Sequence, residues 1–164
     1  MIHLGGRTIL LGGFHDHWSR TNTRNPALLL AAVSYYHYDF MCLMDGESEH
    51  GIAAALEAWL PGFRAYVGVE EFMGWGHVVT VGVRKRVILP PDLPPREAFA
   101  AYEASCDFVA MAHPDSGERA DKVLTYEQVG ALMDEGVIRA TQIGLNPKTR
   151  AWYQAREAAG KLTP

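Results

Sequence analysis

The chain has 164 residues, of which 48% are hydrophobic and 21% charged, and its formal net charge is −4. This length suits one domain with a sizeable core, and the mild negative charge excludes a global basic field of the kind that attracts nucleic acid. Two cysteines make no disulfide framework, no apolar run approaches a membrane span, and the first residues lack the pattern of a signal peptide, so we expect a cytoplasmic protein.

The first apolar run, residues 8–11, leads into a pair of histidines, His15 and His17, with one residue between them. Two residues at this spacing point to the same side of an extended backbone, so both imidazoles can reach one metal ion. We expect the pair at the carboxyl end of a buried strand, where α/β folds build their sites. The alternative is a surface pair on a loop.

Helices and strands then alternate along the chain. In chain order, the expected elements are a helix over 27–36, a strand over 38–44, a helix over 52–60, strands over 63–69 and 77–83, a helix over 96–104, a strand over 108–112, a helix over 125–136, a strand over 137–145 and a helix over 149–159. A stiff proline-rich connector occupies 89–95, and 115–122 indicates a mobile loop. The alternation predicts a mainly parallel sheet, open or closed into a barrel.

Polar residues interrupt the apolar runs mostly at strand ends, namely His15, His17, Asp45, Glu70 and His113, and His77 opens the strand that follows Glu70. In a barrel these strand ends converge on one face, and imidazoles with carboxylates suit zinc, manganese or iron. A carboxylate such as Glu70 can bridge two ions. Each residue also has an alternative role: His77 and His113 as core histidines, and Glu70 as a partner of Arg64.

The order of these motifs resembles the polymerase and histidinol phosphatase (PHP) family of metal-dependent phosphoesterases, from Phe14 to about Asn146. The matching pieces are His-Asp-His, Tyr-Asp-Phe-Met-Cys-Leu-Met-Asp, Gly-Val-Glu, Gly-His-Val-Val-Thr-Val-Gly and Met-Ala-His-Pro. The resemblance implies a single PHP-like domain over 1–164, folded as an α/β protein with a distorted (β/α)7 barrel. It also implies a cluster of divalent metal ions at the carboxyl ends of the strands.

By this resemblance, His15 and His17 would hold one ion, Glu70 would bridge, and His77 and His113 would hold a second ion. The ions would lower the pKa of a bound water, which would attack the phosphorus of a phosphate ester. We expect two ions of zinc, manganese or iron, since Gly46 replaces the histidine that the family uses for a third.

Asp45 and Glu70 are the expected catalytic carboxylates, and Arg20 or Arg24 would contact the substrate phosphate, unless both arginines belong to a solvated loop. The substrate would be a small-molecule phosphate ester or a nucleotide, with DNA ends left open and no membrane partner. The ester itself is not specified by the sequence.

The family ends with an Asp-x-His pair on its last strand, and nothing after His113 supplies one. The expected barrel therefore lacks its last unit or units in this chain, so the domain is C-terminally incomplete or its site is degenerate. One alternative is thus a degenerate PHP-like domain with a structural or binding role. A barrel hydrolase of C–N bonds is a second alternative, but that class uses a lysine or a further histidine at mid-barrel, and no lysine precedes Arg84.

Overall fold

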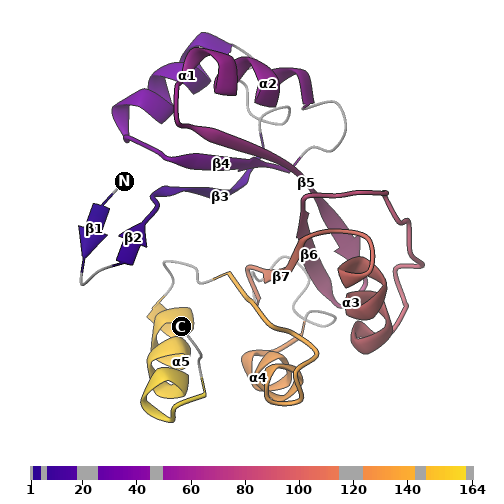
Figure 1. Cartoon of the computed structure of the whole chain (residues 1–164). Helices are drawn as coiled ribbons and strands as arrows, with labels where there is room; N and C mark the ends of the chain where they lie inside the picture. The colour runs from indigo at the N-terminus through magenta and orange to yellow at the C-terminus, as the bar shows by residue number, and fades with distance from the viewer. Residues whose placement is uncertain are drawn as a thin grey trace. The chain divides into compact units, whose positions relative to one another are not determined.

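A computed structural model describes residues 2–4, 7–17, 26–44, 50–114, 124–142 and 147–161 (Figure 1). The strands are β1 (Ile2–Leu4), β2 (Arg7–Ile9), β3 (Gly12–Asp16), β4 (Phe40–Leu43), β5 (Arg64–Met73), β6 (Gly76–Val81) and β7 (Phe108–Ala112). The helices are α1 (Pro26–Tyr35), α2 (His50–Trp59), α3 (Pro95–Glu103), α4 (Tyr126–Asp134) and α5 (Pro147–Ala158). None of the helices in these ranges has the length and apolar character needed to cross a membrane.

Five strands form one sheet in the order β3-β4-β5-β6-β7, and β1 and β2 form a separate antiparallel pair. β4 lies parallel to both β3 and β5, with Phe40 opposite Arg64 and Leu43 opposite Val67. β5 and β6 are neighbours joined by only two residues, Gly74 and Trp75, so they run antiparallel. The sheet is therefore mixed.

The prediction of a distorted (β/α)7 barrel is wrong. Such a barrel needs a helix after every strand and parallel neighbours throughout, whereas β5 turns directly into β6. The strand predicted over 137–145 is not formed over 137–142, where Thr141 makes an isolated parallel bridge to Met111. The described residues form a small α/β fold around a mixed five-stranded sheet.

The chain folds as two compact units. The first unit comprises Met1–Glu70 and Thr80–Val83, and the second comprises Glu71–Val79 and Arg84–Pro164, so the hairpin of β5 and β6 contributes to both. In the first unit, α1 and α2 pack on β4 (Figure 1). The buried residues of this core are Val33, Met41, Leu43, Ala53, Leu56 and Phe63.

In the second unit, α3 and α4 start within one residue of the predicted positions. Pro95 opens α3, because its fixed φ suits the first helical position. Thr125 accepts a hydrogen bond from the Gln128 backbone, and the Gln128 side chain accepts one from the Thr125 backbone, so the two residues form a capping box at the start of α4.

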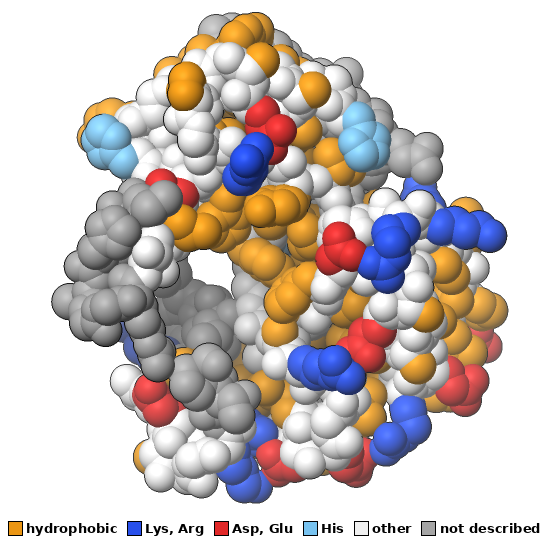
Figure 2. Space-filling view, viewed as in Figure 1, with side chains coloured by type: hydrophobic (Ala, Val, Ile, Leu, Met, Phe, Trp, Pro, Cys, Tyr) orange, Lys and Arg blue, Asp and Glu red, His pale blue; other side chains and the backbone are white. Residues whose placement is uncertain are grey.

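Several ion pairs lie at the surface of the second unit, among them Arg84–Asp107, Arg96–Glu135 and Arg139–Glu103. On the face shown in Figure 2, basic and acidic side chains of the described residues lie beside one another. Pairs of this kind contribute little to stability individually, because solvent screens them.

Candidate metal site

Strand β3 positions two histidines of the first unit, His15 within the strand and His17 directly after its end. Gly13 lies opposite Met41 and Asp16 opposite Leu43, so β3 uses three steps where β4 uses two. This register shift is a β-bulge, a feature that re-aims side chains next to functional sites. The Met44 backbone N–H donates to the Asp16 carbonyl at 2.9 Å, which holds the end of β3 against the end of β4.

Strand β5 delivers Glu70 beside them. Its backbone N–H donates to the Met44 carbonyl at 3.3 Å, so the parallel pairing of β4 and β5 continues to this residue. Glu70 is 7% exposed, which is unusual for a carboxylate and requires compensating polar partners.

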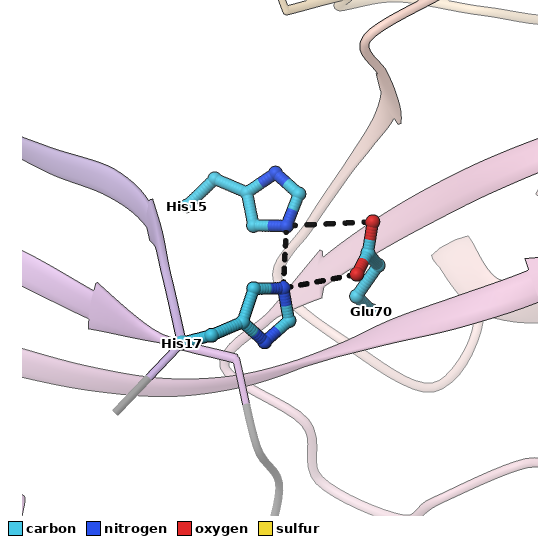
Figure 3. A group of neighbouring side chains, drawn as sticks. All are labelled: His15, His17 and Glu70. Carbon is cyan, nitrogen blue, oxygen red and sulfur yellow. Dashed lines mark hydrogen bonds and ion pairs between the residues drawn. The ribbon is translucent and has the colours of Figure 1, made fainter. Parts of the chain in front are cut away.

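Those partners are the two histidines (Figure 3). His17 Nε2 lies 2.9 Å from Glu70 Oε2, and His15 Nε2 lies 3.5 Å from Glu70 Oε1. The two Nε2 atoms lie 3.0 Å apart, with the rings tilted 61° to each other. Three ligand-type groups thus point at one spot.

This arrangement fits a divalent metal ion. Ligand atoms about 2.0–2.2 Å from one ion lie roughly 3–3.5 Å from each other, which matches the three measured separations. Each neutral imidazole has one nitrogen lone pair, and two such lone pairs aimed at a carboxylate repel one another unless a cation or a shared proton lies between them. His15, His17 and Glu70 could therefore hold an ion.

A second carboxyl group, that of Asp16, lies between the two histidines in the sequence. Burial raises its pKa, and the nearby charges of His15 and His17 act in the opposite direction. Burial, with the charge of Asp16 as a smaller cause, also raises the pKa of the Cys42 thiol to about 12. The sequence interpretation gave Asp16 no role, although its place between the two predicted ligands was a signal for one.

The second predicted histidine pair comes together within the second unit. His77 on β6 and His113 after β7 have ring centroids 4.8 Å apart in an edge-to-face arrangement, and Phe72 packs against His77. The His113 backbone N–H donates to Gln142 Oε1 at 3.3 Å. Both rings are half-buried. Their role as metal ligands stays a prediction.

The remaining predicted site residues, Asp45, Arg20 and Arg24, lie outside the described residues, as does the whole of the predicted loop over 115–122. Arg64, considered as a partner of Glu70, has its Nη1 atom 4.0 Å from Glu57 Oε1.

No protein-family model matches the sequence, and no curated protein matches it either. Among solved structures, the chain is similar to the crystal structure of PsfC from Pseudomonas syringae PB-5123, with a TM-score of 0.53 and 12% sequence identity. The match covers 92% of this chain and 71% of PsfC. At this identity the likeness concerns the fold alone.

Proposed function

We propose that this protein is a metal-dependent phosphoesterase of the PHP kind, which holds a zinc, manganese or iron ion with His15, His17 and Glu70. The observation that carries the proposal is the convergence of two imidazole Nε2 atoms and one carboxylate, all within 3.5 Å of a neighbour in the group. The order of motifs that resembles the PHP family supplies the reaction class, hydrolysis of a small-molecule phosphate ester or a nucleotide.

In this proposal, the chain's own residues bind the metal ion and fix its position. Both imidazoles come from the end of one strand, and the carboxylate comes from β5, which β4 separates from β3 in the sheet, so their backbones are fixed by sheet pairing. A divalent ion held there supplies a Lewis acid for phosphoryl oxygens and lowers the pKa of a coordinated water. Glu70 is buried, so its charge is poorly screened and favours a cation strongly.

Further parts of the mechanism belong to the proposal as well. Asp45 would act with Glu70 as a catalytic carboxylate, and Arg20 or Arg24 would contact the phosphate. His77 and His113 would be ligands of a second ion, which makes two ions in all. The buried thiols of Cys42 and Cys106 support a reducing compartment, and so the proposal of a cytoplasmic protein.

The test is metal content and hydrolysis measured on the same preparations. The full chain, purified without added metal, is analysed for bound elements and then assayed with p-nitrophenyl phosphate and bis-p-nitrophenyl phosphate, with and without a chelator. We expect bound metal, and hydrolysis of one of these esters that the chelator abolishes. His17→Ala should lower the rate by several orders of magnitude without unfolding the domain.

His37→Asn is the matched control. His37 is an exposed histidine in the same unit with a positive φ of 54°, a conformation that asparagine tolerates. This variant should keep its metal and its activity. Full activity in the presence of the chelator would contradict the proposed mechanism.

The alternative function is a degenerate PHP-like domain with a structural or binding role and no catalysis. Gly46, which stands where the family has a histidine, favours it. A folded chain that purifies with little or no metal and hydrolyses neither ester would select this alternative.

A further inference from the structure

Among the described residues, Asp16 is the only one whose carboxyl group has a buried oxygen without a hydrogen-bond partner. That oxygen is Oδ2. A buried polar atom without a partner costs free energy, and a buried charge without a partner costs more. Some other interaction must therefore offset this cost at Asp16, which lies between two candidate metal ligands in the sequence.

Glycine at position 13 makes room for this carboxyl group. A Cβ atom at that position would overlap Asp16 Oδ2 and would lie 3.1 Å from Oδ1. The register shift between Gly13 and Asp16 bends the strand at the same place. The local sequence thus accommodates a carboxyl group against the backbone of β3, at the residue that separates the two candidate histidine ligands in the chain.

The charges around this carboxyl group favour a cation near it. Positive charge on His15 or on His17 is attracted to Asp16. The neighbouring Cys42 thiol is 2% exposed and carries no charge at neutral pH. An ion held by the two imidazoles would bring two positive charges close to the same carboxylate, where burial limits screening by water and salt.

We propose that Asp16 is a positioning residue of the metal site, whose buried carboxylate provides a counter-charge for the ion held by His15, His17 and Glu70. Asp16 does not touch the ion. It acts through the charge of its two sequence neighbours, His15 and His17, in the way that groups outside the ligand shell strengthen other metal sites. This inference rests on the proposed metal binding.

Asp16→Asn tests the charge with little change in size. The dissociation constants of Zn²⁺ and Mn²⁺ are measured on the full chain by competition with a chelating dye, and thermal unfolding is measured without metal. We expect the variant to bind both ions about 10–100-fold more weakly. Its metal-free form should unfold at the same temperature as the unmodified chain or higher, because a costly buried charge is removed.

The opposite signs of these two effects separate a counter-charge from a merely structural role. If Asp16 only supported the bulge, Asp16→Asn would lower the unfolding temperature without metal and leave the affinity of the folded chain unchanged. Asp39→Asn is the control, since Asp39 is a carboxylate of the same unit that accepts a hydrogen bond from the Leu11 backbone at 3.0 Å. It should change metal affinity less than twofold.

Equal affinities of Asp16→Asn and the unmodified chain would overturn the inference and leave the proposed metal site standing. A similar loss in Asp39→Asn would also overturn it, because any carboxylate of the unit would then have the same effect. Failure of the unmodified chain to bind either ion would overturn both the inference and the proposed function.

Discussion

Replacing Leu56 by alanine should destabilise the first unit strongly. Leu56 lies on α2, is 1% exposed, and packs in the core that α1, α2 and β4 share. Leucine-to-alanine changes at such sites cost about 2–5 kcal/mol, because they remove the buried methyl groups and leave a cavity. Taking about 3 kcal/mol, and about 2–4 °C per kcal/mol for a chain of this size, we expect the melting temperature to fall by roughly 6–12 °C.

Leu28→Ala is the matched comparison. Leu28 lies on α1, is 53% exposed, and undergoes the same change of side chain and of helix propensity. With about half of its surface in water, it should cost at most about 1 kcal/mol. Both variants are measured by calorimetry and by urea unfolding of the metal-free chain. Equal shifts in the two variants would refute the assignment of this face of α2 to the core.

Two further predictions concern titratable side chains. Since burial raises the pKa of the Cys42 thiol to about 12 and Cys106 is also buried, Ellman's reagent at pH 8 should detect no thiol in the folded chain and two after unfolding; fast labelling of the folded chain would contradict this. Hydrogen bonds from Lys161 and Arg156 lower the pKa of Asp134 below its ordinary value of 3.8. The ionised Asp134 therefore stabilises the fold at pH values above 3.8, and this stabilisation is lost as the pH falls through the lowered pKa. Asp134→Asn should therefore be less stable than the unmodified chain at pH 7 and approach it in acid, and a constant difference at all pH values would count against this ion pair.

Most helices and strands could be predicted because their signals are local. The strand predicted over 108–112 coincides with β7, and the helix predicted over 96–104 differs from α3 by one residue at each end. Apolar periodicity, capping residues and prolines act within a few positions of each other, so a sequence window contains the whole cause.

The start of β3 could not be predicted in this way. The sequence favoured a strand over 8–11, yet the strand with the two histidines begins at Gly12. Glycine is depleted in strands, so no local signal marks Gly12 as the first residue of one. In the structure, a Cβ at Gly12 would overlap Phe40, and one at Gly13 would overlap Asp16. Both positions require glycine because a neighbouring side chain occupies the space of a Cβ atom, and this neighbour comes close only in the folded chain.

The failure of the barrel prediction does not remove the candidate metal site, because the site needs only three neighbouring strands. β4 lies between β3 and β5, so the backbones of the strands that carry the ligands are separated by two strand spacings, about 9–10 Å. Two histidines and a glutamate are long enough to meet across that distance above the end of β4, where Met44 connects to both neighbours through its backbone. Closure of a barrel would add further ligands from other strands, whereas the parallel order β3-β4-β5 suffices to bring His15, His17 and Glu70 together. The candidate ligands His15, His17 and Glu70 thus depend on a part of the predicted topology that the structure retains, parallel strands in sequence order.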